Sequence, residues 1–452
     1  MILLYRSAVG RWPILAVALS LVMSACGASI APSRIGPSSS ATRASPVTAP
    51  LLTASPSSTR DDAWRIAIDT LISERERVHP NPYQGIDKAT YLAAADDLAA
   101  KIPNLNDEQA LAGITRLAAM PGWKGREGHS GIFPFTPETG THAYPLRFWR
   151  FSDGLTITAA RAPYGDLVGS QVTAIAGKPI DEVMALVEPM APRDNPSNLL
   201  AYGPLYMRQA ELLAGVGVIE HAGPAVFSVV NRDGAAHNVT VEPIAAADDV
   251  IWTNALPMVL PPRDVMWLHD STEPVWWRFL DDSKTLYLQY NEVVATGSVA
   301  NEILARVARG GVERVVVDLR NNGGGDNHRY ARLLEALQDP SIDRPGRLVV
   351  LFGRLTFSAA GNFATEVEAT TGAVFVGEAM GSSPNLYGDV RRSSLPTVRL
   401  DVYIASVYWQ KSTADDPRIT IEPDLAVPYS SDDYFNDRDP QLEAAIRNPV
   451  RR

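Results

Sequence analysis

Cysteine is nearly absent from this chain, since Cys26 is the only one among 452 residues. A single cysteine excludes a disulfide and a cysteine-ligated metal site within one chain. A block of consecutive Lys or Arg is also missing, and the net charge of −10 leaves no electrostatic footprint for nucleic acid. We therefore set nucleic-acid binding aside and expect neither a metal nor another cofactor.

The first 25 residues have the pattern of an export signal: two arginines, a short apolar run from Pro13 to Met23, and small residues after it. The run is too short for a membrane-spanning helix, which needs about 20 apolar residues. Met23-Ser24-Ala25-Cys26 resembles the lipobox of bacterial lipoproteins. This resemblance implies that residues 1–25 are a signal peptide and that Cys26 carries lipid; the alternative is a chance cysteine after a signal peptide.

Residues 26–60 are dominated by Ser, Ala, Pro and Thr and hold too few large apolar side chains to fold. We predict a flexible tether here. It would hold the exported part outside the cytoplasm, lipid-anchored to a membrane of the bacterial cell envelope through Cys26.

The remaining chain has a globular composition, with 46% hydrophobic and 20% charged residues, and is long enough for two or three folded units. Apolar residues at three- and four-residue spacing predict a helical segment over 61–135. Short alternating runs between Asp-Gly and Gly-Lys-Pro turns predict a β-rich domain over 140–250. Within it, Gly169–Met190 (GSQVTAIAGKPIDEVMALVEPM) resembles a PDZ domain, which implies that extended peptide binds at an open sheet edge.

The third segment, 276–447, alternates strands with helices. The runs VERVVVDL, GRLVVLFG and AVFVGE predict buried strands, and helices are expected over 298–309, 327–337 and 358–370. This order predicts an α/β fold with a mostly parallel sheet that helices cover. Functional residues in such folds lie at the carboxyl ends of the strands.

Ser358 lies at such a position, in LFGRLTFSAAGNFATE (Leu351–Glu366), between an apolar strand and an alanine-rich helix. Serine is favoured at helix starts, where its hydroxyl accepts a backbone N–H, so a helix cap is one interpretation. A nucleophile is the other, because the positive end of the helix dipole and the unpaired N–H groups there stabilise a developing negative charge.

A glycine-rich turn, Arg320–Asp326 (RNNGGGD), follows the strand before it. Three successive glycines let a substrate approach the main chain closely. A phosphate cradle is disfavoured, because the turn has neither a Gly-Lys-Ser/Thr ending nor the G-x-G-x-x-G pattern. A plain turn remains the alternative.

Taken together, VVVDLRNNGGG and VVLFGRLTFSAAGNFA resemble the tail-specific or carboxy-terminal processing family of serine peptidases, which includes the tricorn core protease and related retinoid-binding repeats. The resemblance implies a crotonase/ClpP-like αββ core sheet with helices. It also implies that Ser358 is the nucleophile and that the N–H groups of Gly324 and Ala359 form the oxyanion hole. The family motifs D-x-R-x-N-x-G-G, T-x-S-A-A/G and G-E are matched by Asp318, Arg320, Asn322, Gly324 and Gly325, by Thr356, Ser358, Ala359 and Ala360, and by Gly377 and Glu378.

A serine nucleophile needs a base. One branch of the family uses a lysine after the G-E strand, but here Ser382 or Ser383 takes that place and Lys411 is the only lysine after Ser358. The tricorn-like branch takes a histidine from the segment before the PDZ domain, in a D-G-H-T/S motif. Glu127-Gly128-His129-Ser130 resembles this motif, with Glu127 in place of the Asp, which implies His129. His328 is the alternative by proximity to the glycine turn, although we expect it to be an exposed residue of the following helix.

The acid that orients this histidine precedes a terminal G-x-x-P-D-I segment in the family, which Ile421–Leu425 matches. We prefer Asp416, with Asp415 and Glu422 as alternatives.

These residues predict a membrane-tethered, extracytoplasmic serine peptidase that cuts polypeptide through an acyl-enzyme on Ser358. Two other functions stay open. One is an inactive lipoprotein of the same fold that binds a peptide or an apolar ligand. Two departures from the family pattern favour it: the absent lysine and Glu127 in place of the family's Asp. The other is an esterase or another acyl hydrolase.

Overall fold

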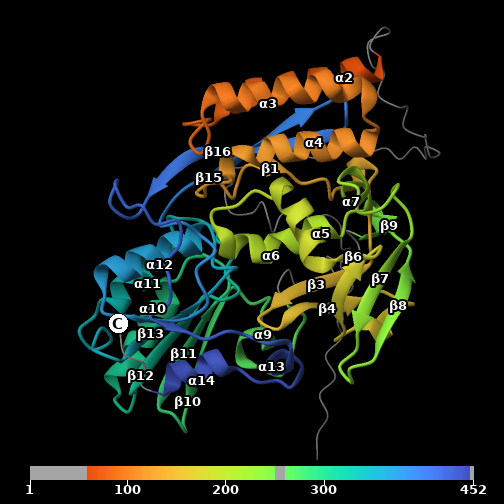
Figure 1. Ribbon diagram of the computed structural model, residues 1–452. Helices are drawn as coiled ribbons and strands as arrows, with labels where there is room; N and C mark the ends of the chain where they lie inside the picture. Colours follow the sequence, from red (N-terminus) through yellow and green to blue (C-terminus); the bar gives the residue numbers. More distant parts are fainter. Residues whose placement is uncertain (1–58, 250–259, 448–452) are drawn as a thin grey trace, which may run out of the picture.

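The computed structural model describes residues 59–249 and 260–447 (Figure 1). The predicted signal peptide, Cys26 and nearly all of the predicted tether lie outside these residues. In the two described ranges, no helix has both the length and the apolar character that crossing a membrane requires.

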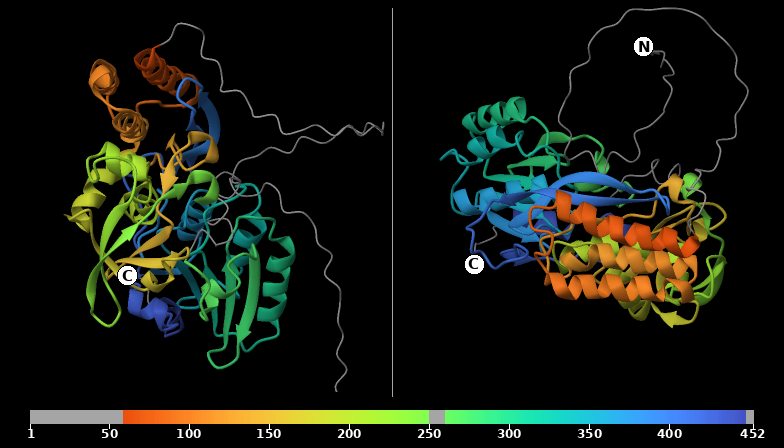
Figure 2. Two further views of the ribbon diagram at one scale, coloured as in Figure 1. Left: turned by 90° about the vertical axis from the view of Figure 1, so that its right-hand side faces the viewer. Right: turned by 90° about the horizontal axis from the view of Figure 1, so that it is seen from above.

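Three helices occupy the predicted helical segment: α2 (Arg60–Val78), α3 (Lys88–Lys101) and α4 (Asp107–Ala119). Each begins after a polar residue, Thr59, Asp87 or Asn106, whose side chain accepts a backbone N–H of the first turn. Seen from above, the three helices lie side by side (Figure 2).

A long hairpin from the third segment crosses over to these helices. It consists of β15 (Asn385–Leu395) and β16 (Leu400–Gln410), and α2 packs against both strands. Strand β1 (Gly131–Ile132) pairs with β16, with Gly131 opposite Tyr403. This pairing brings the chain next to His129 beside the third segment, although the two are far apart in the sequence.

The β-rich part forms a sheet in the order β3-β4-β5-β7-β8, with β6 added to β5. Helix α6 packs against β3 and helix α7 packs against α4, so this sheet shares one hydrophobic core with the N-terminal helices. The PDZ-like character of this part stays a prediction. Its elements are β3 (Leu146–Phe151), β4 (Gly154–Ala160), β5 (Gln171–Ile175), β6 (Lys178–Pro179), α5 (Ile180–Val187), α6 (Pro196–Met207), α7 (Ala210–Gly215), β7 (Ala225–Val230) and β8 (Ala236–Val241), with a separate pair β2 (His142–Ala143) and β9 (Ile244–Ala245).

The third part is built on a sheet in the order β10-β11-β12-β13-β14-β17, in which only β10 is antiparallel to its neighbour. This confirms the predicted mostly parallel sheet. Helices α10 to α12 cover one face and α14 covers the other (Figure 1). The elements are α9 (Met266–His269), β10 (Val275–Leu280), β11 (Thr285–Tyr290), α10 (Gly297–Ala308), β12 (Arg314–Asp318), α11 (Ala331–Leu337), β13 (Leu348–Phe352), α12 (Ala359–Thr370), β14 (Val374–Gly377), β17 (Leu425–Ala426), α13 (Ser431–Phe435) and α14 (Pro440–Ile446).

One helix starts later than predicted, which moves His328 out of it. Helix α11 begins at Ala331 rather than near residue 327. The carboxylate of Asp326 accepts the backbone N–H of His328 at 2.9 Å, and this local bond favours a turn over a helix. His328 is therefore an exposed turn residue.

Candidate active site

Ser358 lies in a strained turn between β13 and α12. Its backbone has φ 55° and ψ −127°, a conformation that residues with a side chain rarely adopt. The residue occupies the N-cap position of α12, yet its hydroxyl caps no N–H group of the helix. The cap interpretation is therefore wrong, and the strain needs another explanation. Sharp strand-to-helix turns of this kind present serine nucleophiles in some hydrolases.

Hydrogen bonds from two other segments hold this turn. The hydroxyl of Thr356 donates to the carbonyl of Leu319 at 2.9 Å, and the N–H of Phe357 donates to the carbonyl of Asn322 at 3.0 Å. The N–H of Ser358 donates to the hydroxyl of Ser382 at 2.8 Å. Ser382, one of the two serines predicted at the place of the family's lysine, thus holds the backbone of Ser358.

The glycine turn touches Ser358 directly. A Cβ on Gly324 would lie 2.7 Å from the Cβ and 3.1 Å from the Oγ of Ser358, and Gly324 has φ +120°. A Cβ on Gly325, at φ +142°, would lie 2.4 Å from the carbonyl oxygen of Val293. Only glycine satisfies both the backbone angle and the space at these two positions.

The two predicted oxyanion donors differ in their present bonds. Within the described chain, the N–H of Ala359 has no acceptor, as expected for the first residue of a helix. The N–H of Gly324 donates to the side-chain oxygen of Asn322 at 3.0 Å. The Ala359 N–H is therefore unpaired among the described residues, whereas the Gly324 N–H already has an acceptor.

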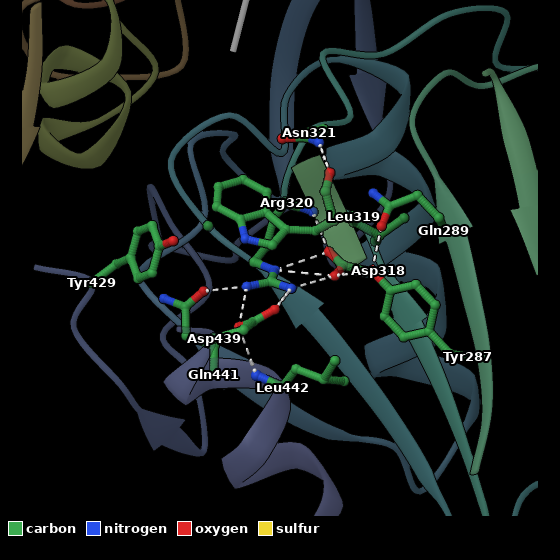
Figure 3. Close-up of polar contacts among 12 residues, drawn as sticks. Tyr287, Gln289, Asp318, Leu319, Arg320, Asn321, Tyr429, Asp439, Gln441 and Leu442 are labelled. Atoms are coloured by element: carbon green, nitrogen blue, oxygen red, sulfur yellow. Dashed lines mark hydrogen bonds and ion pairs between the residues drawn. The ribbon is translucent and has the colours of Figure 1, made fainter. Parts of the chain in front are cut away.

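The residues Asp318 and Arg320 of the first motif form a buried anchor with Asp439 (Figure 3). The Arg320 guanidinium binds Asp318 at 2.6 Å and Asp439, just before α14, at 2.8 Å. Tyr287 donates to Asp318 at 2.7 Å, and Gln441 accepts from Arg320 at 3.1 Å. The Asp318 and Arg320 side chains therefore tie the glycine turn to the C-terminal helix, and both are buried.

The structure brings the His129 segment against the Ser358 turn. The His129 ring stacks on the ring of Phe357, with centroids 4.4 Å apart and planes 19° apart. Both ring nitrogens are shielded from solvent and have no hydrogen-bond partner among the described residues. No hydrogen bond therefore joins Ser358 to His129 in this structure.

Burial lowers the pKa of His129 to about 4, against the opposing influence of Glu127, Asp389 and the nearby backbone of Tyr387. The ring is therefore neutral at pH 7, which is the form that a general base requires, although burial also weakens its basicity. Glu127 itself is buried; burial alone would raise its pKa, but Arg75 and His79 outweigh that effect and hold it below its usual value. His79 contacts a Glu127 oxygen at 2.8 Å.

The role of Asp416 as the orienting acid stays a prediction, and its present partners do not include His129. Its carboxylate accepts the hydroxyl of Ser412 at 2.6 Å and forms an ion pair with Arg418 at 2.9 Å. The hydrogen bond from Arg418 is the main reason that its pKa lies well below the usual range. These two partners occupy the carboxylate, and none of its bonds reaches His129.

The two alternative acids, Asp415 and Glu422, are both exposed. The carboxylates that influence His129 are instead Glu127 and Asp389. No sequence motif marked Asp389. Its place near His129 depends on the pairing of β15 with β16, which a local sequence pattern does not show. Asp389 has φ 53° and accepts the indole N–H of Trp409 at 3.1 Å.

Lys411 and His328 contact residues other than Ser358 in this structure. The Lys411 ammonium contacts the carboxylate of Glu366, two turns further along α12. The His328 ring is exposed and its nearest aromatic neighbour is Trp409, at 6.1 Å between centroids.

No protein-family model and no curated protein matches the chain. Solved structures do match. Mature CPAF complexed with lactacystin is 13% identical and aligns over 86% of this chain and 100% of its own, with a TM-score of 0.56. Mature CPAF without that compound is 13% identical over 85% and 98%, with a TM-score of 0.55. The chain therefore has the mixed helix and sheet fold of CPAF over most of its described length.

The photosystem II D1 C-terminal processing protease also aligns, at 12% identity over 86% of this chain and 97% of its own, with a TM-score of 0.41.

Proposed function

We propose that the protein is a serine peptidase that hydrolyses polypeptide through an acyl-enzyme on Ser358. The observation that carries this proposal is the strained backbone of Ser358 at the start of α12, with a hydroxyl that does not cap the helix and an unpaired N–H on Ala359. The contact between Gly324 and Ser358 and the shared fold with CPAF support it.

In the proposed reaction, Ser358 Oγ attacks the carbonyl carbon of the scissile peptide bond while His129 accepts the hydroxyl proton. The N–H of Ala359 stabilises the oxyanion, joined by that of Gly324 once it leaves Asn322. His129 then gives its proton to the leaving amine, the C–N bond breaks, and a water molecule activated by His129 releases the acyl group from Ser358. Glu127 and Asp389 stabilise the imidazolium that forms between these steps.

We further propose that this peptidase lies outside the cytoplasm and is attached to a membrane by a lipid on Cys26. The lipobox-like sequence and the Ser/Pro/Ala-rich tether support the anchor. The β-rich part would present an extended peptide in the manner of a PDZ domain.

Hydrolysis of an unfolded protein such as casein by the exported part tests the proposal. Ser358→Ala and His129→Ala should each abolish it while the protein stays folded. Ser73→Ala is the matched control, since Ser73 is an exposed serine of α2. Hydrolysis that survives Ser358→Ala would contradict the proposal.

The same variants separate the other two functions. An esterase would turn over p-nitrophenyl esters in a Ser358-dependent manner and leave casein intact. A binding protein would retain a peptide and would cleave neither casein nor the p-nitrophenyl esters.

A further inference from the structure

We infer that Asp194 is a positioning residue that holds the His129 segment and the support of Ser358 in register through its two carboxylate oxygens. Asp194 lies just before α6, outside the core sheet, and its side chain does not itself touch the reacting groups. This inference rests on the proposed function for its kinetic consequences.

The position of the Asp194 carboxyl group is energetically unfavourable for a charge. Asp194 is 0% exposed, and among the described residues it forms no ion pair. A buried carboxyl without a counter-ion destabilises a protein unless hydrogen bonds replace the lost water. The structure supplies two such bonds, and both come from the backbone of the candidate site.

The first bond fixes the histidine side. Oδ1 of Asp194 accepts the N–H of Gly128, the residue before His129, at 2.7 Å. The backbone carbonyl of Asp194 also accepts the N–H of Arg126 at 2.9 Å. The approach is close: a Cβ on Gly128 would lie 3.0 Å from Oδ1 and 2.9 Å from the ring of Phe357.

The second bond fixes the serine side. Oδ2 of Asp194 accepts the N–H of Ser383 at 3.1 Å, and the hydroxyl of Ser383 donates to the Asp194 carbonyl, also at 3.1 Å. The preceding residue, Ser382, accepts the N–H of Ser358 at 2.8 Å. A continuous path of bonds therefore runs from the backbone beside His129, through Asp194, to the backbone of Ser358.

The need for both oxygens explains why this residue is an aspartate. An asparagine of the same shape has one acceptor oxygen, and its NH₂ group would face one of the two backbone N–H donors. The carboxylate, in contrast, accepts both bonds at once. A displacement of about 1 Å in a catalytic group lowers a rate about 100-fold, so the loss of either bond should be visible in kinetics.

The ionisation of Asp194 gives a second readout. Burial raises its pKa to about 7, opposed by the N–H groups of Gly128 and Ser383 and by Arg126, and reinforced by the charge of Glu127. Asp194 also acts electrostatically on Tyr202 of α6, whose pKa is raised mainly by burial and further by this carboxyl group. Because the ionised form accepts both bonds better, the acylation rate should rise with pH through about 7 in the wild-type protein.

The test compares Asp194→Asn with the wild-type protein and with Asp153→Asn. Asp153 is the matched control: its exposed carboxylate also accepts a backbone N–H from a distant segment, that of Ser431 at 3.0 Å. We expect Asp194→Asn to lower kcat for peptide hydrolysis about 10- to 100-fold with little change in KM, and to remove the ionisation near pH 7. Asp153→Asn should stay within about twofold of wild type.

Hydrogen–deuterium exchange keeps the inference testable without any activity. In Asp194→Asn, peptides covering 126–131 and 382–385 should exchange faster, and the core sheet should not. An inactive wild-type protein that shows this pattern would overturn the proposed function and leave the positioning role intact. An active wild-type protein whose Asp194→Asn variant keeps both its kcat and its exchange pattern would overturn the positioning role alone.

If Asp194→Asn does not fold, Ser382→Ala supplies the second variant, because it removes only the acceptor for the N–H of Ser358. It should lower kcat with little change in KM. An unchanged kcat in Ser382→Ala would show that the bond from Ser358 to Ser382 does not affect catalysis, and would overturn the inference.

Discussion

Replacing Gly324 by alanine should disable the site with little damage elsewhere. The new Cβ would lie 2.7 Å from Ser358 Cβ and 3.2 Å from the N atom of Ala359, so the glycine turn or the Ser358 turn must move. The backbone at φ +120° adds strain of about 1–3 kcal/mol for a residue with a side chain. A shift at this point also misplaces an oxyanion donor, which is worth about 3 kcal/mol in the transition state.

Together these effects predict an acylation rate about 100- to 1,000-fold below wild type and a loss of stability of about 2 kcal/mol. The rate of reaction with a fluorophosphonate and urea unfolding measure the two quantities. Gly323→Ala is the matched control, because a Cβ there meets nothing within 4 Å. If the two alanine variants reacted at similar rates, the argument from the Gly324–Ser358 contact would be refuted.

Three further predictions concern the anchor, the base and the acid. Arg320→Ala leaves Asp318 and Asp439 buried without their partner, so urea unfolding should show a loss of about 3–5 kcal/mol; a loss below about 1 kcal/mol would contradict the anchor. Burial lowers the pKa of His129 to about 4, so the folded state favours the neutral ring. The free energy of unfolding of the wild-type protein should therefore fall as pH drops from 6.5 towards 4, and it should fall less in His129→Asn. Asp416→Asn should lower stability and leave the acylation rate within about tenfold of wild type, whereas removal of a true orienting acid lowers it about 10,000-fold.

The core sheet was predictable because its signals are local. The strands β12, β13 and β14 are apolar runs bounded by turn residues, and the helices between them have helical spacing. The place of Ser358 between a strand and a helix was predictable for the same reason, since both elements follow one another within a few residues. The sequence did not reveal that its hydroxyl leaves the helix uncapped, because that depends on φ at one residue.

The surroundings of His129 were not predictable in the same way. The position of His129 came from a resemblance, and its role as the base stays a prediction. Asp389 reaches the region only because the β15–β16 hairpin leaves the third segment and β16 pairs with β1. Asp194 belongs to no motif that the sequence revealed, and its bond to Ser383 depends on the fold. Asp416 was preferred because of its place in the chain, but its side chain binds Arg418. Such contacts depend on tertiary register, which a local pattern does not contain.

Labelling by a fluorophosphonate probe tests the central claim most directly, because the probe reacts with an activated serine and needs no knowledge of the substrate. We predict one label per chain, attached at Ser358, in the wild-type exported part, with loss of labelling in Ser358→Ala and strong slowing in His129→Ala. Ser73→Ala should label like wild type. A folded wild-type protein that takes no label, or a label that persists in Ser358→Ala, would contradict the account.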